Sequence, residues 1–256
     1  MNKKLFTMIT SIILLVTLLP TGGCKLSDEL SDIENPESFS WEDIFLFDEN
    51  ISGSMNANGV DQTQITVHIL GDTPDGQPIT FRTDTGAFAS KPIISGNENA
   101  SQEIIVKSSA QKARVYLISG IEEKRGVISA SLEGYTIFRE LSYTRVIPEK
   151  IVVSTNTTQL TANGNDTAAL SVELIAPNTN FGRGTVTVNT RIIFTARDIS
   201  TGQSLSGLHR EALSDNKGYA TAAITGRHIG TVKITATVEN EKISDDVTIV
   251  FVEEED

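Results

Sequence analysis

The sequence predicts an all-β protein of two tandem β-sandwiches, which follow a targeting segment and an acidic tether. Short runs of alternating apolar and polar residues, rich in Val, Ile and Thr, recur along the chain. Asn-Gly and Asp-Gly pairs, which favour tight turns, separate these runs. Two stretches about one hundred residues apart are alike, the spacing of two domains of sandwich size. No stretch after the targeting segment keeps a helical period for three turns.

Residues 1–23 have the features of a secretory signal peptide. Lys3 and Lys4 precede an apolar run over residues 5–19, and Pro20 ends that run before small residues. A retained membrane anchor is the alternative, but the run is short for a membrane span. Cys24, which follows directly, is the only cysteine of the chain, so no internal disulfide is possible.

The stretch "LLPTGGC" resembles the signal of bacterial lipoproteins, although Thr21 stands where Leu is usual. This resemblance implies cleavage before Cys24 and lipidation of that residue with several acyl chains such as palmitate. More than one acyl chain makes membrane attachment stable. Lys25 follows, where an Asp would favour the inner membrane of enteric bacteria. We therefore expect lipid anchoring in the outer membrane, with the protein exposed at the cell surface.

Residues 24–43 are predicted to form an acidic tether. From residue 27 to residue 50 the chain carries acidic residues and no Lys or Arg, which is typical of a solvated linker. Its "SDELSD" also resembles the acidic export signal of surface lipoproteins of Bacteroidetes. The aromatic stretch at its end is interpreted as core or edge packing rather than as an exposed docking peptide. That stretch contains Phe39, Trp41, Phe45 and Phe47.

Two internal repeats define the predicted sandwiches. "SMNANGVDQTQITVHIL" begins at Ser54 and "QLTANGNDTAALSVELI" at Gln159, and both contain Ala-Asn-Gly-x-Asp before a run of alternating residues. Further on, Phe81 aligns with Phe194. The last matching runs pair Ile128, Ala130 and Leu132 with Ile234, Ala236 and Val238. The repeat length is that of an immunoglobulin (Ig)-like sandwich. We therefore predict Ig-like sandwiches over residues 44–147 and 148–256, with Pro148 at the joint.

The second repeat resembles bacterial Ig-like domains of the invasin and intimin type (Big-1). The residues that carry this resemblance are "VSTNTTQLTANGNDTAALSVEL", the strand around residues 192–195 and "SDNKGYATAAITGRHIGTVKITATVE". In the first repeat "SQEIIVKSSAQKARVYLISG" replaces the Asp-x-x-Gly turn, so its membership rests on the relation between the repeats. The resemblance implies disulfide-free sandwiches with a role in adhesion or cell-surface display.

The sequence predicts no enzyme, no cofactor and no metal site. The three histidines, His68, His209 and His228, lack the spacing of a metal pair, and no nucleophile or phosphate-binding motif occurs. "DTPDG" and "SDNKG" are interpreted as turns rather than calcium loops, because further carboxylates are missing. The formal net charge of -12 disfavours nucleic acid as a partner.

Binding residues are expected in loops at the ends of the sandwiches. The second repeat carries an insertion over residues 176–189, in which Phe181 and Arg183 are the candidate contact residues. A longer hairpin with a flexible tip is the alternative. A second candidate loop, residues 204–215, contributes His209 and Arg210, unless it only connects two strands.

These features predict an outer-membrane surface lipoprotein that acts as an adhesion or spacer/binding module, with a protein or glycan ligand. One alternative is a glycan-capture accessory lipoprotein of an outer-membrane uptake system. The only Trp, Trp41, lies outside both predicted sandwiches, which disfavours this alternative because sugars stack on aromatic side chains. The other alternative is a periplasmic scaffold for envelope assembly.

Overall fold

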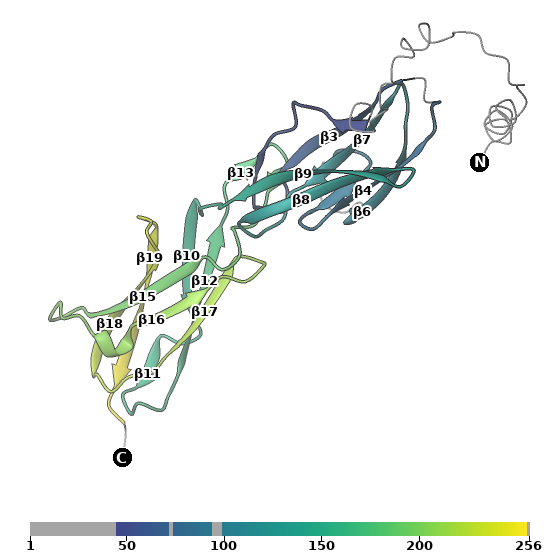
Figure 1. The fold of residues 1–256 in the computed structure, drawn as a ribbon. Helices are drawn as coiled ribbons and strands as arrows, with labels where there is room; N and C mark the ends of the chain where they lie inside the picture. Colours follow the sequence, from purple (N-terminus) through teal and green to yellow (C-terminus); the bar gives the residue numbers. More distant parts are fainter. Residues whose placement is uncertain (1–44, 72–73, 94–98, 255–256) are drawn as a thin grey trace, which may run out of the picture. The chain divides into compact units, whose positions relative to one another are not determined.

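The computed structural model describes residues 45–71, 74–93 and 99–254, which form two β-sandwiches joined in series along the chain (Figure 1). All of them belong to one compact unit, Trp41–Asp256. One short 3-10 helix, η2 (Ser206–Leu208), is the only helical element among these residues. The predicted all-β fold is confirmed.

The first sandwich packs a four-stranded sheet, in the order β1-β3-β7-β5, against a five-stranded sheet, in the order β2-β9-β8-β4-β6. Its strands are β1 (Phe45–Phe47), β2 (Ser54–Asn56), β3 (Gln62–Ile69), β4 (Pro78–Thr83), β5 (Ala87–Ala89), β6 (Glu103–Lys107), β7 (Lys112–Ile118), β8 (Lys124–Leu132) and β9 (Tyr135–Thr144).

The second sandwich packs a three-stranded sheet, β10-β12-β17, against a five-stranded sheet, β11-β19-β18-β15-β16. A separate hairpin pairs β13 with β14. The strands are β10 (Lys150–Thr155), β11 (Gln159–Thr161), β12 (Ala168–Ile175), β13 (Asn178–Thr179), β14 (Gly182–Arg183), β15 (Arg191–Asp198), β16 (Arg210–Leu213), β17 (Tyr219–Ile224), β18 (Gly230–Val238) and β19 (Ser244–Val252).

The strands that the two sandwiches share have the same order, as the internal repeat predicts, whereas β5 of the first sandwich has no counterpart in the second. In each one the second strand leaves the first sheet and pairs in parallel with the last strand, β2 with β9 and β11 with β19. The alignment of the repeats also gives the right register. Phe81 of β4 lies opposite Ala130 of β8, and Phe194 of β15 lies opposite Ala236 of β18.

Each sandwich has its own hydrophobic core. The first core is built around fully buried side chains such as Phe45, Phe81 and Phe88, and the second around Phe194 and Phe251. Alternation places these residues on the inner face of each sheet, and a buried aromatic side chain of this kind contributes about 1.5–3 kcal/mol by the water it releases. Residues 145–149 connect β9 to β10, and Val146 among them already packs in the second core.

The aromatic stretch before the first sandwich ends in its core. Phe45 and Phe47 form β1 and pair with Ile69 and Val67 of β3. Phe45 is fully buried, so the predicted core packing of this pair is confirmed. Phe39 and Trp41 lie outside the described residues.

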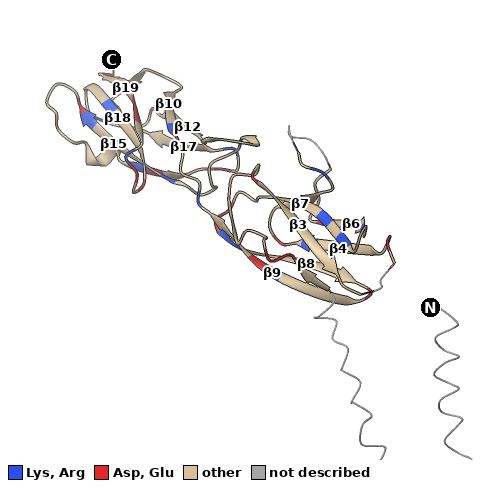
Figure 2. Cartoon of the chain, turned by 90° about the horizontal axis from the view of Figure 1, so that it is seen from above, with Lys and Arg blue, Asp and Glu red and all other residues tan. Residues whose placement is uncertain are grey.

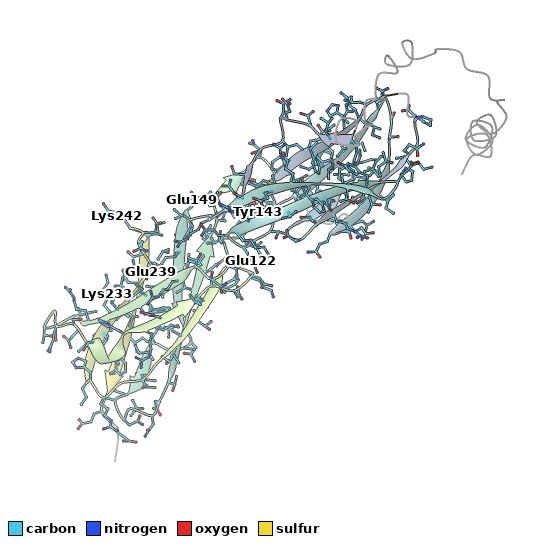
Figure 3. The ribbon with its side chains drawn as sticks, viewed as in Figure 1. Glu122, Tyr143, Glu149, Lys233, Glu239 and Lys242 are labelled. Atoms are coloured by element: carbon cyan, nitrogen blue, oxygen red, sulfur yellow. The ribbon has the colours of Figure 1, made fainter. Side chains whose placement is uncertain are left out.

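Tyr143 closes the end of the first core that leads to the second sandwich (Figure 3). Its hydroxyl donates a hydrogen bond of 3.0 Å to the carbonyl oxygen of Thr85, and burial raises the pKa of the phenol to about 12. Gly126 makes room for the ring, because a Cβ there would lie 2.7 Å from Cε2 of Tyr143.

One local expectation needs correction. Residues 210–213 of the second predicted loop form strand β16 at the edge of a sheet, so the alternation in "REAL" outweighs the polar residues around it. In the first repeat a two-residue turn replaces the Asp-x-x-Gly turn of the second. Its residues, Ala110 and Gln111, both have positive φ without being Gly or Asn, so the sequence carries no ordinary turn signal there.

Candidate functional site at the joint of the sandwiches

A loop that follows β2, here called the first corner loop (residues 57–61), is fixed by the side chain of Asn58. Asn58 Oδ1 accepts hydrogen bonds from the amides of Val60 and Asp61, at 3.0 and 2.8 Å, and from the hydroxyl of Ser119 at 3.0 Å. Its Nδ2 donates to Asp61 Oδ1 at 2.8 Å. Asn58 is only 3% exposed, and these bonds satisfy its buried amide. The turn is therefore built by a side chain rather than by a strand ladder.

An extended stretch of the second sandwich, here called the docking segment (residues 184–188), hydrogen-bonds to this end of the first sandwich. Thr185 N donates to the carbonyl oxygen of Asn58 at 2.9 Å, and Val188 N donates to that of Ile121 at 3.0 Å. The hydroxyl of Thr187 donates to the carbonyl oxygen of Ala57 at 3.3 Å and accepts from Val146 N at 2.7 Å. Main-chain groups carry most of these contacts, which join two residue stretches far apart in the sequence.

Close packing at this joint depends on a glycine. A Cβ on Gly184 would lie 2.3 Å from the carbonyl oxygen of Asn58 and 2.8 Å from a methyl group of Val60. Thr187 is 3% exposed and Val186 is fully buried in the second core. The docking segment thus belongs to the core of one sandwich while it binds the backbone of the other.

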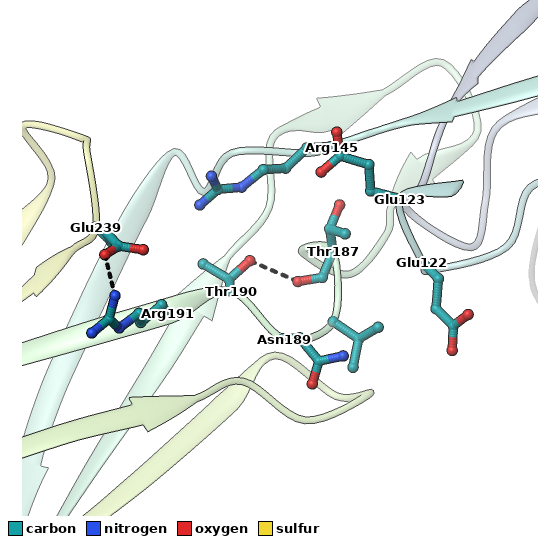
Figure 4. Close-up of a pocket in the computed structure, with 9 residues that line it drawn as sticks. Glu122, Glu123, Arg145, Thr187, Asn189, Thr190, Arg191 and Glu239 are labelled. Carbon is teal, nitrogen blue, oxygen red and sulfur yellow. Dashed lines mark hydrogen bonds and ion pairs between the residues drawn. The ribbon is translucent and has the colours of Figure 1, made fainter. Parts of the chain in front are cut away.

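A polar pocket of about 350 Å³ opens beside the docking segment (Figure 4). Its lining residues are Glu122, Glu123, Arg145, Thr187, Val188, Asn189, Thr190, Arg191 and Glu239. Arg191 bridges Glu211 and Glu239, and hydrogen bonds with Glu211 raise the pKa of its guanidinium. The hydroxyl of Thr190 donates to the carbonyl oxygen of Thr187 at 2.7 Å. These bonds all lie within the second sandwich, and the residues that line the pocket contain no nucleophile paired with a base.

The predicted contact residues Phe181 and Arg183 lie on the β13–β14 hairpin, which forms the first part of the insertion. The side chain of Phe181 is 38% exposed, whereas Arg183 donates from Nε to Asn178 Oδ1 at 3.1 Å. Phe181 lines a groove of about 620 Å³ with polar residues of the first sandwich. Those residues are Ser52, Ser54, Asn56, Asp61, Gln62 and Thr63, together with Met55.

The other two predicted contact residues lie elsewhere in the second sandwich: His209 stands between η2 and β16, and Arg210 is the first residue of β16. Arg210 uses its guanidinium internally, since it donates to the carbonyl oxygens of Ala223, Gly207 and His209. His209 is exposed directly before β16. The structure therefore separates the four candidate residues into two segments, and it assigns Arg210 a bracing contact.

His228 and Ser200 both contact Asp198, but not in the order of a catalytic triad. Asp198 Oδ1 accepts from the Ser200 hydroxyl at 2.6 Å and from Thr201 N at 2.7 Å, while Oδ2 lies 2.5 Å from His228 Nε2. In a triad the histidine stands between the serine and the acid, whereas here the acid stands in the middle. The hydroxyl and amide donors, followed by His228, hold the pKa of Asp198 well below its usual range. This cluster fixes a loop.

His68 makes a similar pair at the other end of the chain. Its Nε2 lies 3.0 Å from Asp48 Oδ2, and both side chains are partly exposed. The amide of Asn50 and then His68 lower the pKa of Asp48 to about 2. His68 and His228, which the sequence predicts to be surface or loop residues, thus each pair with an aspartate.

The turn interpretation of "SDNKG" is supported by its hydrogen bonds. Asp215 Oδ1 accepts from Lys217 N at 2.8 Å and from Tyr219 N at 2.9 Å, so this carboxylate is occupied by its own turn. No group of three His, Cys, Asp or Glu able to hold a metal occurs among the residues that the structure describes. No helix in the described ranges is long and apolar enough to span a membrane. Cys24 lies outside these ranges.

Sequence reasoning missed the docking segment itself. The signal was present, because "GTVTV" follows the hairpin and alternates as an extended segment does. The sequence predicts a contact loop here instead. The partners of the segment are backbone carbonyl oxygens of the first sandwich, and no particular side chain marks them. Backbone acceptors leave no trace in a sequence.

Solved structures share the fold. No protein-family model matches the sequence, and no curated protein matches it. The crystal structure of invasin, described as a bacterial integrin-binding protein, aligns with a TM-score of 0.54 and 18% identity over 82% of this chain and 39% of that chain. The adhesin InvE of Yersinia pseudotuberculosis aligns with a TM-score of 0.51 and 15% identity over 81% of this chain and 58% of that chain.

These alignments assign the class of fold, which is a tandem array of Ig-like sandwiches of the invasin type. The chain spans about two fifths of the invasin structure and less than two thirds of the InvE structure. At this level of identity the similarity shows the fold alone and does not assign the activity of the larger proteins to this chain.

Proposed function

We propose that the protein is a surface lipoprotein, anchored in the outer membrane through a lipid on Cys24, in which two Ig-like sandwiches act as an adhesion or spacer/binding module. The signal features before Cys24 and the acidic stretch after it support the anchor and the tether. In this proposal residues 1–23 are removed, residues 24–43 form the tether, and the sandwiches span residues 44–147 and 148–256.

One observation favours the spacer role over a binding role for the insertion. The part of the insertion that continues past the hairpin is the docking segment, whose backbone bonds Asn58 and Ile121. In a free contact loop these backbone amides would be available to hydrogen-bond a ligand. Here they donate to carbonyl oxygens of the first sandwich. Figure 2 shows Lys and Arg interspersed with Asp and Glu along both sandwiches.

The adhesion role is the finer part of the proposal. Invasin is described as integrin-binding and InvE as an adhesin, and both share the fold. For this chain a protein ligand would contact exposed loop residues that the joint leaves accessible, of which Phe181 is the largest apolar one on the insertion.

Surface display can be tested by protease treatment of intact and lysed cells that produce the full chain. Digestion on intact cells is the expected result, and a Cys24→Ser variant should lose both lipid labelling with palmitate and membrane fractionation. Survival on intact cells together with digestion in lysates would identify the periplasmic scaffold instead. Cys24→Ser that still incorporates palmitate would contradict the anchor.

The glycan-capture alternative has one specific observation in its favour. The groove beside Phe181 combines an exposed aromatic ring with hydroxyl and amide side chains, the chemistry that sugars use. However, Asn56 Nδ2 already donates to Asp61, and Gln62 pairs with the backbone of Ile93. Glycan-array binding that Phe181→Ala abolishes would favour this alternative, and absence of any glycan binding supports the spacer.

A further inference from the structure

Strand β6 forms one edge of the five-stranded sheet of the first sandwich, and within the described residues β4 is its only strand partner (Figure 1). The two strands are antiparallel, so successive residues of β6 turn their backbone groups alternately toward β4 and away from it. Thr83 N donates to the carbonyl oxygen of Gln102, and Ser108 N donates to that of Gln77. The even-numbered residues of this stretch therefore bond β4, and the odd-numbered residues present their backbone groups to the outside.

The outward backbone groups of β6 belong to Glu103, Ile105 and Lys107, here called the free edge. The amide of Glu103 donates to the hydroxyl of Ser101 at 3.3 Å. The amides of Ile105 and Lys107, and the carbonyl oxygens of all three residues, have no hydrogen-bond partner among the described residues. A row of unpaired backbone groups at the edge of a sheet is a template for a further strand.

The side chains of the free edge carry two opposite charges around an apolar residue. Ile105 is 61% exposed. Glu103 Oε2 accepts a hydrogen bond of 2.8 Å from Arg82 Nε, whereas Oε1 of the same carboxylate has no hydrogen-bond partner in the described part of the chain. Lys107 forms no ion pair with any described residue. One carboxylate oxygen and one ammonium group are thus available two residues before and two residues after the isoleucine.

The free edge is complementary to itself in one antiparallel register. When two copies of β6 pair about Ile105, Glu103 of each copy lies opposite Lys107 of the other, and the two Ile105 side chains lie opposite each other. A register centred on Glu103 or on Lys107 would instead place like charges opposite each other, which is destabilising. The register about Ile105 also uses the outward amides and carbonyl oxygens, so the backbone bonds and the charges select the same pairing.

We infer that the free edge of β6 is a self-association surface, on which a second copy of this chain pairs its own β6 in antiparallel fashion about Ile105. The five-stranded sheets of the two first sandwiches then form one continuous sheet around a two-fold axis. Charge complementarity identifies the occupant as a second copy, because a strand with the same sequence satisfies both Glu103 and Lys107 at once. The contact is confined to one strand edge, so a single pair is weak and gains strength from many copies on one surface.

Antiparallel pairing also sets the direction of the two copies. Phe45, where the first described range begins, packs against Tyr135 at the start of β9, whereas Tyr143 near the end of β9 lies at the joint. Because the strands of the sandwich share one axis, reversal of β6 reverses the whole copy, and the two Phe45 ends lie at opposite ends of the pair. This arrangement suits copies on two facing cells, a consequence that rests on the proposed surface display.

The experiment uses the full chain with either of two C-terminal tags, solubilised in detergent and mixed. One tag captures the protein, and the recovery of copies with the other tag is measured. Wild type should recover its second copy. Glu103→Lys places lysines opposite each other and Lys107→Glu places glutamates opposite each other, so each variant alone should recover roughly tenfold less. A mixture of the two variants restores opposite charges at both pairs and should recover the wild-type amount.

Two further variants separate the edge of the sheet from its face. Phe138, which is 69% exposed on β9 of the same sheet, lies outside the free edge, so Phe138→Ala should leave the recovery unchanged. Ile105→Pro removes an outward amide while the bonds to β4 remain, and proline is tolerated at such edge positions. This variant should lose the second copy although its circular-dichroism spectrum and its urea unfolding remain those of a folded sandwich.

Equal recovery from wild type, from each charge variant alone and from their mixture would overturn the inference, because association through lipid or detergent gives that pattern. A mixture that recovers no more than the single variants would overturn it as well. On cells, producers of Glu103→Lys should clump with producers of Lys107→Glu and not among themselves. Recovery of the purified mixture without such clumping would refute the arrangement on facing cells. Capture from detergent does not depend on display, so its failure is distinguishable from failure of the proposed function.

Discussion

Thr185 and Asn58 form a backbone hydrogen bond of 2.9 Å, from the amide of one sandwich to the carbonyl oxygen of the other. The side chain of Asn58 accepts hydrogen bonds from the amides of Val60 and Asp61 and so fixes the turn that presents its carbonyl oxygen to Thr185. The joint is thus a consequence of an Asx-type turn at the end of a strand rather than of a hydrophobic patch. The following predictions test the joint, the cores and the buried acid.

Gly184→Ala should weaken the joint, because the new Cβ would lie 2.3 Å from the carbonyl oxygen of Asn58. Relief of that contact requires the docking segment to move, at a cost of about 1–3 kcal/mol. The rate of amide hydrogen exchange at Thr185 should rise, while the amides of the strands within each sandwich should still exchange slowly. Gly53→Ala is the matched control, since no atom lies within 4 Å of its Cβ position. Unchanged exchange at Thr185 in Gly184→Ala would refute the steric role.

Thr187→Val should destabilise the joint although it preserves the shape of the side chain. The substitution removes the acceptor of Val146 N and the donor to the carbonyl oxygen of Ala57. A buried amide left without a partner costs about 1–3 kcal/mol, which urea unfolding can measure. Thr187→Ser keeps the hydroxyl and should lose less. A loss in Thr187→Ser as large as the loss in Thr187→Val would contradict a dominant role of the hydroxyl.

Phe81→Ala and Phe194→Ala should have similar effects, because the residues occupy equivalent positions opposite Ala130 and Ala236. Both are fully buried, so each truncation should lower the free energy of unfolding of its own sandwich by about 3–5 kcal/mol. Hydrogen exchange, followed strand by strand, should show the loss confined to the substituted sandwich. Equal loosening of both sandwiches by either variant would contradict two separate cores.

Acid should destabilise the loop that Asp198 holds. The pKa of this carboxyl is lowered in the folded protein, chiefly by the Ser200 hydroxyl and the amide of Thr201. A lowered folded pKa means that the stabilisation is complete above the unfolded value of about 3.9 and is lost as the pH falls below it. The free energy of unfolding, measured with urea from pH 6 down to pH 2, should therefore decrease less steeply in Asp198→Asn than in wild type. Parallel pH profiles would show that the ionised carboxyl does not contribute.

The repeat made most of the fold predictable. Because Phe81 aligns with Phe194 and Ala130 with Ala236, the sequence identifies equivalent strands in the two sandwiches, and the structure shows that these strands pair in the same register. Side-chain alternation carries this information directly, since it decides which residues face the core. The short strand β5 carries too few alternating residues to be recognised, whereas a hairpin at the insertion was already the alternative interpretation of its sequence.

The candidate site was only partly predictable, for a physical reason. Phe181 is exposed on the insertion, as a contact residue would be, but the insertion continues into residues 184–188, which bind backbone carbonyls. Such acceptors belong to every residue type and leave no pattern. Arg210 was grouped with the loops on its charge, whereas its position before an alternating stretch makes it the first residue of β16.

The most direct test of the joint is amide hydrogen exchange at Thr185 and Val188 in the full chain, compared with Asn58→Ala. The substitution removes the side-chain bonds that shape the first corner loop, so the carbonyl oxygens of Asn58 and Ile121 should lose their donors. We predict slow exchange at both amides in wild type and exchange faster by roughly tenfold in the variant. Rapid exchange at Thr185 and Val188 already in wild type would contradict a joint held by these bonds.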